Sequence, residues 1–440
     1  MAIAPSGNPS KTCKKGLILA AKLIRQPDQL VLIGAPTSAG TAGAGVERGP
    51  EALRAAEIVE KLRQVGYQVT DGGDLPASPF QPDPENPRAR NLRNVLAMLD
   101  GLRVRVEQSS RSHALPVVLG GDATIVLALV AGLRRQAASL GLIHVGRYAD
   151  LRTPTRTEDG LVEPMTGSHL VGQGAPELIR FWKDPPLVRE PDLVLFGLGE
   201  TDEIDRDRLE QLAIRRVPLT RIRQMGPKDA AEMALERLRA SSRDFVIHLS
   251  LDAFSAEEMP GCPRGAAGGL SLDEAREAMN CFAALESFAG LSVSGYDPGL
   301  DPEGQGAVGI VDLVVAALAV RHTALLQPAV TEEPETSSEE AGKPGAEAEP
   351  AGVEKAARAE EEKPKGSEEA GGPEKAEESA KNEETGPQAE DDVDSRAVEV
   401  VQAEADLTGP GETLPGAAGG SGSTVASTEA SPDEPKAQNA

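Results

Sequence analysis

The stretch Val31–Arg54, VLIGAPTSAGTAGAGVERGPEALR, decides the fold class of this 440-residue chain. It opens within a short apolar run, Leu30–Gly34, that ends in Gly-Ala-Pro, as is typical of a buried strand feeding a loop. A glycine-rich segment follows, and then an amphipathic stretch, Pro50–Val65. Proline in its first turn and Gly66 at its end predict a helix there. The sequence therefore predicts a strand, a loop and a helix in succession.

The same alternation continues to about residue 325. Further apolar runs predict strands at Tyr67–Thr70, Leu115–Leu119, Leu142–Val145, Leu193–Leu198, Phe245–Leu251 and Leu291–Ser294. The segments between them predict helices at Asn91–Glu107, Thr124–Leu140, Pro227–Ala240, Leu272–Phe288 and Ala307–Leu325. Apolar strands separated by such helices predict an α/β fold whose parallel sheet is covered on both faces. Sites in such sheets form in the loops after the carboxyl ends of the strands.

Composition divides the chain into three parts. We expect a polar N-terminal arm with a short helix at residues 1–27, an α/β domain at 28–327 and an acidic tail at 328–440. The formal net charge is −25, and residues 331–440, with 29 acidic and 9 basic side chains, account for −20 of it. All the aromatic residues precede this tail. The tail is expected to be disordered because it cannot bury a core, with a transient helix at Asp391–Leu407.

Charge and composition also exclude several classes of function. An acidic chain is not expected to bind nucleic acid, which needs clusters of Lys and Arg. No run of about 18 apolar residues predicts a membrane span, and the start of the chain lacks a secretory cleavage pattern. Three cysteines without a CxxC motif fit a reduced, cytoplasmic setting.

Four motifs, in order, carry a family resemblance. They are Val46–Arg54 (VERGPEALR), Asp71–Asp74 (DGGD), Leu119–Asp122 (LGGD) and Gly268–Ser271 (GGLS). Over about residues 28–325 the chain resembles the ureohydrolase family, which contains arginase, agmatinase and formiminoglutamase. The resemblance implies a three-layer α/β/α sandwich around a parallel sheet. It also implies a homo-oligomer, a trimer or hexamer, and a small guanidino-type ligand.

The family's chemistry is hydrolysis of a guanidino or related C–N bond by a hydroxide that bridges two Mn²⁺ ions. Its six metal ligands come from GGDH, DAHxD and DxD motifs. By this resemblance two ligands survive here, Asp150 and Asp252, and four are replaced, by Ala123, Gly146, Tyr148 and Phe254. We therefore expect no cofactor. Mn²⁺ would be the ion if any metal site survived, and the two aspartates could hold a single hard cation.

The resemblance also suggests catalytic candidates. Glu200 aligns with a substrate-binding aspartate, and His169 corresponds to a proton-shuttling histidine. His169 as a loop residue with one hydrogen bond is the alternative, and His144 and His248 are expected to be core histidines. Tyr148 and Phe254 either fill the volume that the metals left or line a small apolar pocket. The polar anchors of that pocket would be Arg147, Asp150, Arg152 and Glu200.

Three functional hypotheses follow. The first is a non-catalytic protein of ureohydrolase fold with a binding, structural or regulatory role. The second is a divergent but active hydrolase of C–N bonds in guanidino or linear amidine substrates, with one metal or none. The third is an inactive partner subunit in a mixed oligomer with an active family member.

Overall fold

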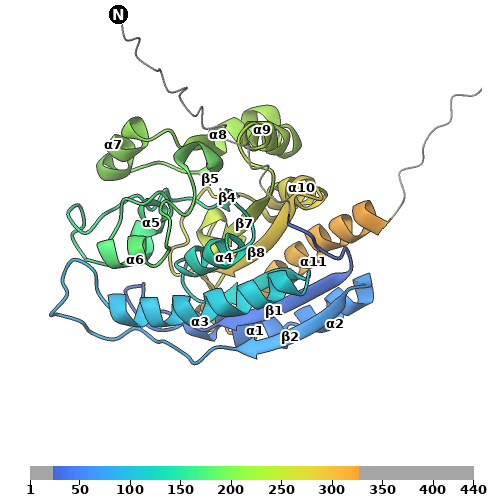
Figure 1. Cartoon of the computed structure of the whole chain (residues 1–440), viewed down its shortest axis with the longest axis horizontal. Coiled ribbons are helices and arrows are strands. Elements are labelled where there is room, and N and C mark those ends of the chain that lie inside the picture. Colours follow the sequence, from blue (N-terminus) through green and yellow to red (C-terminus); the bar gives the residue numbers. More distant parts are fainter. Residues whose placement is uncertain (1–22, 327–440) are drawn as a thin grey trace, which may run out of the picture. The chain divides into compact units, whose positions relative to one another are not determined.

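A parallel sheet of eight strands forms the centre of the protein (Figure 1). The computed structural model describes residues 23–326; the arm before them, the tail after them and the helix expected at Asp391–Leu407 lie outside the described residues. The strands are β1 (Gln29–Ala35), β2 (Gln68–Asp74), β3 (Leu115–Gly120), β4 (Gly141–Val145), β5 (Leu193–Leu198), β6 (Arg215–Pro218), β7 (Phe245–Ser250) and β8 (Phe288–Ser294). Their order is β2-β1-β3-β8-β7-β4-β5-β6, and every neighbouring pair is parallel.

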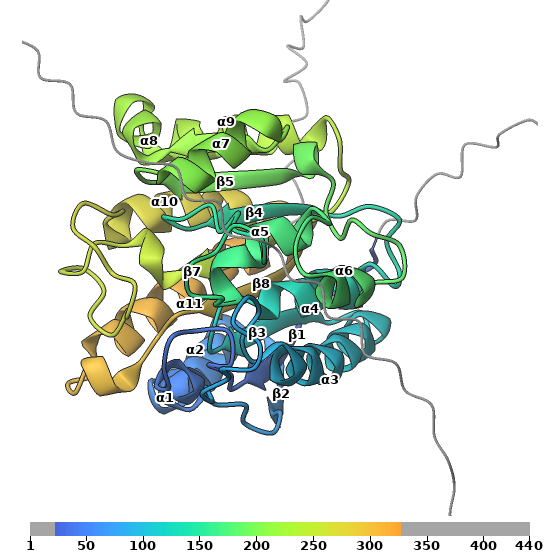
Figure 2. The ribbon, with the colours of Figure 1, turned by 90° about the vertical axis from the view of Figure 1, so that its left-hand side faces the viewer.

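Helices cover both faces of the sheet. They are α1 (Gly49–Ala55), α2 (Ile58–Val65), α3 (Leu92–Arg111), α4 (Ile125–Leu133), α5 (Thr166–Leu170), α6 (Pro176–Arg180), α7 (Glu203–Gln211), α8 (Leu219–Met225), α9 (Pro227–Arg239), α10 (Leu272–Ala283) and α11 (Gln305–Leu326). The side chains of α1, α2 and α8–α11 pack in one hydrophobic cluster, and those of α3–α7 pack in a second. Figure 2 shows these two layers on either side of the strands. The predicted three-layer α/β/α fold is confirmed.

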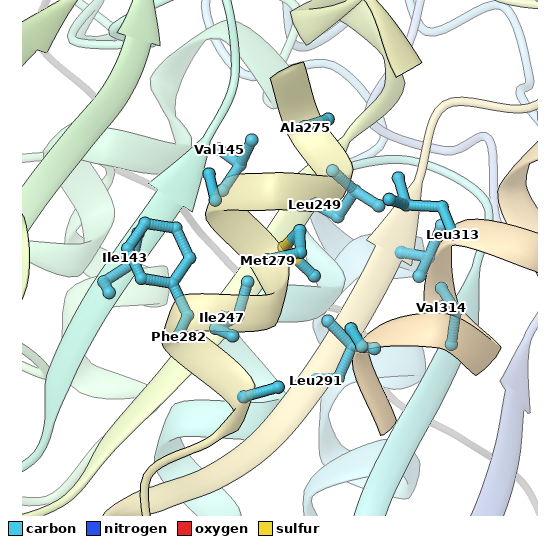
Figure 3. Close-up of a cluster of buried hydrophobic side chains, with 14 of the residues drawn as sticks. Ile143, Val145, Ile247, Leu249, Ala275, Met279, Phe282, Leu291, Leu313 and Val314 are labelled. Atoms are coloured by element: carbon cyan, nitrogen blue, oxygen red, sulfur yellow. The ribbon is translucent and has the colours of Figure 1, made fainter. Parts of the chain in front are cut away.

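The alternation of side chains along each strand builds the two clusters. Ile143 and Val145 of β4 face the first cluster, whereas Leu142 faces the second. Figure 3 shows the first cluster, in which Met279 and Phe282 of α10 lie over the strands. Each such fully buried side chain contributes about 1.5–3 kcal/mol of transfer free energy. This packing fixes the strands, and with them the loops at their carboxyl ends.

Several elements differ from their predicted form. The helix expected at Pro50–Val65 is two helices, because Glu57 adopts a left-handed backbone with φ of 67°. α4 ends at Leu133, earlier than predicted. Strand β6 was not predicted, because its sequence, RRVP, is short and polar at the edge of the sheet. The helices α5–α8 were not predicted either, and three of them have seven residues or fewer.

Helix α11 is the one helix among residues 23–326 that is long and apolar enough, by length and composition, to cross a membrane. Such a helix is weak evidence, since core helices pass the same test. α11 packs against α10 and α2 and buries Ile310, Leu313 and Val314 in the first cluster. Its apolar composition therefore has a packing role.

Candidate functional site

Asp150 and Asp252 follow the neighbouring strands β4 and β7, so their loops meet at the same edge of the sheet. Both are almost completely buried, with 3% and 2% of their surfaces exposed. Asp252 Oδ1 accepts a hydrogen bond of 2.9 Å from the backbone N–H of Arg147 in the loop after β4. Asp150 has a left-handed backbone, with φ of 51°, which only a minority of non-glycine residues adopt. The structure thus places the two aspartates that the resemblance implies as ligands in loops after adjacent strands.

A guanidinium lies between these carboxylates. Arg264, in the loop between β7 and α10, donates from Nη2 to Asp150 Oδ1 at 2.8 Å. Its Nη1 lies 3.7 Å from Asp252 Oδ2 and 3.7 Å from Glu163 Oε2. Burial alone would lower the pKa of Arg264, but the charges of Asp150, Asp252 and Glu163 outweigh it and hold the pKa well above its ordinary value. The guanidinium is therefore a permanent cation at this place.

Tyr148 forms one wall of this cluster. The guanidinium carbon of Arg264 lies 4.4 Å from the centre of the Tyr148 ring, a cation–π contact. The Tyr148 hydroxyl also donates a long hydrogen bond, 3.4 Å, to the Arg264 backbone carbonyl. Tyr148 thus contacts both the head and the backbone of Arg264.

Glu163 supplies the third carboxylate. It is 7% exposed, begins a short 3₁₀ helix at Glu163–Met165, and accepts at Oε1 a 2.9 Å hydrogen bond from the backbone N–H of Ala123. Burial raises its pKa to about 7, against the opposing effect of Arg264 and with a further rise from Asp122. The Asp122 carboxylate accepts hydrogen bonds from Thr37, Gly40 and Thr124. Both of its oxygens are therefore already paired within the loops that follow β1 and β3.

Two other positions at which the resemblance implies a replaced ligand, Phe254 and Gly146, are closely packed. Phe254 is fully buried in the first hydrophobic cluster. Gly146 faces the ring of His144, and a Cβ added at Gly146 would overlap His144 Nε2. The rings of His144 and His248 lie 5.2 Å apart, and His248 hydrogen-bonds Ser292 and Ser294. Both histidines are buried, but the prediction that both are satisfied core histidines holds for His248 and not for His144. Of these two rings, that of His144 has a nitrogen, Nε2, without a hydrogen-bond partner within residues 23–326.

The two catalytic candidates, His169 and Glu200, lie outside the cluster around Arg264. His169, in α5, is 2% exposed, and burial lowers its pKa to about 3. Glu200 is exposed after β5. Neither lines the cavity described below. Arg152 pairs with Asp202 at 2.7 Å, and the Arg147 side chain donates to the carbonyl of Ala267. The structure does not bring these polar anchors together around one apolar pocket.

A cavity of about 360 Å³ opens over the cluster. Four carboxylates line it, those of Asp159, Glu163, Asp252 and Asp297, together with Arg264. Cys262 also lines it, but burial and, after it, the charge of Asp252 raise the pKa of the thiol to about 12. Because the thiolate is the nucleophilic form, Cys262 is not suited to nucleophilic attack near neutral pH.

Sequence reasoning missed Arg264 and Glu163. Neither lies in a family motif or in an amphipathic pattern, and a single charged residue in a loop is usually solvated. One feature of the sequence could have indicated such a cation. If the aspartates at positions 150 and 252 are buried and their companion ligands are replaced, as the resemblance implies, the two carboxylates need a positively charged partner from elsewhere in the chain.

Comparison with known proteins identifies the family. The model of the arginase family matches residues 28–320. The chain belongs to the arginase family. It is 28% identical to an arginase of Staphylococcus aureus over 288 residues, which are 64% of this chain and 94% of that protein. The crystal structure of Bacillus subtilis arginase superposes with a TM-score of 0.61 at 26% identity, covering 66% of this chain and 98% of the other. Proclavaminate amidino hydrolase from Streptomyces clavuligerus, at 18% identity and a TM-score of 0.53, covering 69% of this chain and 96% of the other, shares the fold.

The arginase family implies two Mn²⁺ ions, and the residues present can be compared with that need. Within residues 23–326 no group of three or more His, Cys, Asp or Glu side chains is arranged to hold a metal ion. Asp150 and Asp252, the two ligands that the family resemblance implies, both pair with the guanidinium of Arg264. Two aspartates beside a fixed cation do not supply the donor set of a two-metal centre.

Proposed function

We propose that this arginase-family protein does not carry out hydrolysis with two Mn²⁺ ions and acts as a binding, structural or regulatory protein. One observation carries the proposal: Arg264 Nη2 lies 2.8 Å from Asp150, and Arg264 Nη1 lies 3.7 Å from Asp252. A cation that is part of the chain thus pairs with both surviving ligands of the family motif.

Electrostatics explains why this arrangement opposes a metal ion. Two unit charges 4 Å apart interact by about 4 kcal/mol at an effective dielectric constant of 20. A divalent ion that close to the Arg264 guanidinium would therefore meet a repulsion of about 8 kcal/mol. Arginine cannot relieve it by losing its proton, because its pKa is far above neutral. The four replaced ligands leave little coordination to offset that repulsion.

Elemental analysis and a turnover assay together test the proposal. The full chain, dialysed against Mn²⁺, is expected to retain far less than one equivalent and to release no urea from arginine or agmatine. Bacillus subtilis arginase, treated in parallel, is the positive control. Stoichiometric manganese together with urea release would refute the proposal.

A second candidate function rests on the cavity. Its four carboxylates against one arginine favour a small cationic ligand, such as a guanidino compound or an amine. Asp252 Oδ2 is buried and without a hydrogen-bond partner within residues 23–326, so it could accept one from a ligand. A thermal-shift screen with arginine, agmatine and putrescine tests this function. A shift in the wild type that Asp297→Asn reduces supports it, and no shift with any of the three counts against it.

The divergent-hydrolase hypothesis makes a different prediction for the same samples. Turnover of a guanidino or amidine substrate that disappears in Asp252→Ala would favour it. The mixed-oligomer hypothesis, the homo-oligomeric state and a cytoplasmic location remain predictions. Co-purification with an active arginase would support the mixed oligomer, and a homo-oligomer without partners would count against it.

A further inference from the structure

Two of six family ligands persist here, and their persistence needs a physical reason. Asp150 and Asp252 are 3% and 2% exposed. Burying an ionised carboxylate is costly unless it is paired and hydrogen-bonded. Without metals, two such carboxylates near each other would repel as well as being desolvated. Their retention is explained if another cation has taken over the pairing.

Arg264 meets the requirements of that cation. Its Nη1 is buried, although 27% of the whole side chain is exposed, so the charged end is enclosed. The planar guanidinium offers several N–H groups in a fixed geometry, and three carboxylates surround it. Arg264 Nη1, Asp150 Oδ2 and Asp252 Oδ2 are all buried without hydrogen-bond partners among the described residues. Beyond the hydrogen bond from Nη2 to Asp150, the guanidinium therefore acts on Asp252 and Glu163 through charge, at 3.7 Å.

The local backbone holds this side chain in place. The residues Cys262–Gly265 form a turn in which the Gly265 N–H donates to the Cys262 carbonyl at 3.0 Å. The loop is fixed on either side by the bridges Phe254–Leu270 and Ser255–Ala266. Phe254, one of the four replaced ligand positions, is thus an anchor of the loop that carries Arg264.

We propose that Asp150, Asp252, Glu163 and Tyr148 form a guanidinium-binding site that Arg264 occupies in cis, in place of the family's metal ions. The inference rests on the proposed absence of a two-metal centre. Arg264 joins two connections of the sheet: it lies with Asp252 in the connection between β7 and α10, and it pairs with Asp150 and Glu163, which both lie in the connection between β4 and β5. The internal cation therefore holds together the loops that metal ions would otherwise join.

The replaced ligand positions fit this site. Tyr148, at the position of a ligand histidine, stacks on the guanidinium at 4.4 Å. Ala123 presents its backbone N–H to Glu163, which orients that carboxylate. Of these two residues only Tyr148 contributes its side chain to arginine binding, because the Ala123 N–H is a backbone group that any non-proline residue would supply.

Chemical rescue tests the site on the full chain. Arg264→Ala leaves three buried carboxylates without their cation, so we expect its Tm to fall by about 5 °C or more. Guanidinium chloride at about ten times its dissociation constant is expected to raise the Tm of Arg264→Ala by about 2–3 °C. The wild type, whose site is full, should show no such rise. Sodium chloride at equal ionic strength controls for screening, and Arg223→Ala, which removes a half-exposed arginine, is the matched variant.

Two outcomes overturn the inference. One is an Arg264→Ala protein as stable as Arg223→Ala. The other is a guanidinium effect that is equal in Arg264→Ala, in the wild type and in Arg264→Ala with Asp150→Asn. If Arg264→Ala does not fold, Arg264→Lys decides. Asp150→Asn should then lower the Tm less in Arg264→Lys than in the wild type, because lysine lacks the planar fork, and equal losses would refute the site.

The two proposals fail in distinguishable ways. Manganese binding with urea release by the wild type would overturn the proposed function. Absence of rescue in a protein that binds no manganese would overturn only the role of Arg264.

Discussion

Replacing Glu163 by glutamine should change how the stability of this protein depends on pH. Burial raises the pKa of Glu163 from an ordinary 4.5 to about 7 in the folded protein. A carboxyl group with a raised pKa favours the folded state while it is protonated. Its contribution is fully present below the unfolded pKa of 4.5 and is lost as the pH rises through about 7. Glutamine resembles the protonated form at every pH and so removes this dependence.

The magnitude follows from the two pKa values. One pKa unit corresponds to about 1.4 kcal/mol, so the change from 4.5 to about 7 corresponds to about 3 kcal/mol. In a domain of this size that is a Tm difference of roughly 5 °C or more. In Glu163→Gln the new amide oxygen can still accept from the Ala123 N–H. The attraction between the ionised Glu163 carboxylate and Arg264 is already included in the pKa of about 7, so its loss belongs to the pH-dependent difference.

Urea unfolding between about pH 5 and pH 8 measures the effect. The free energy of unfolding of Glu163→Gln minus that of the wild type should increase by about 2–3 kcal/mol between the two ends, which span most of the titration. Other groups also titrate. Burial, with Asp150 and Asp202, raises the pKa of Asp205 to about 6, and burial lowers that of His169 to about 3. Asp205 and His169 are present in both the wild type and Glu163→Gln, so their contributions cancel when the two free energies of unfolding are subtracted. Glu158→Gln, at an exposed position, is the control. A flat difference across this range would refute the assignment of a raised pKa to Glu163.

Two further predictions concern Gly146 and Arg25. Gly146→Asp introduces the aspartate that the family resemblance implies at this position but places its Cβ against His144, so we expect a loss of about 1–3 kcal/mol in the free energy of unfolding. We also expect that Gly146→Asp binds no manganese. Thermal melts measure the loss of stability and elemental analysis measures the metal, and bound manganese would contradict the expectation that this site does not hold a metal ion. Arg25→Ala breaks a buried ion pair with Asp244 at 2.9 Å, with exposures of 5% and 2%, so urea unfolding should show a loss of about 3–5 kcal/mol. A loss below about 1 kcal/mol would be inconsistent with a buried pair.

Much of the fold could be predicted from local sequence because its strands are buried on both faces. The runs at Leu115–Leu119 and Leu142–Val145 are almost wholly apolar, and they form the central strands β3 and β4. The edge strand β6 carries arginines and gives no such signal. The break at Glu57 could not be seen either, because the amphipathic pattern continues through it while the backbone turns. Prediction therefore succeeded for these fully buried strands and missed the short, polar edge strand β6.

The residues of the site also fall into those that the sequence pointed to and those that it missed. Asp150 and Asp252 could be singled out from the sequence because they lie in loops after recognisable strands, where the family resemblance implies ligands; their role as ligands stays a prediction. Glu163 and Arg264 were not, since their roles depend on contacts across about 100 residues of sequence or more. His169 illustrates the converse. Its motif suggested catalysis, but its surroundings bury it within α5, outside the lining of the cavity.

By itself, the sequence determined the alternation of strands and helices and the family; its list of replaced ligands stays a prediction from the family resemblance. These are properties of nearest neighbours and of spacing, which hydrophobic periodicity and motifs record directly. Only the tertiary structure decided which cation the surviving aspartates face. That choice depends on the loop that follows Asp252 folding back so that Arg264 reaches both carboxylates. Charges separated along the chain interact only once packing brings them within a few ångströms and removes the water between them.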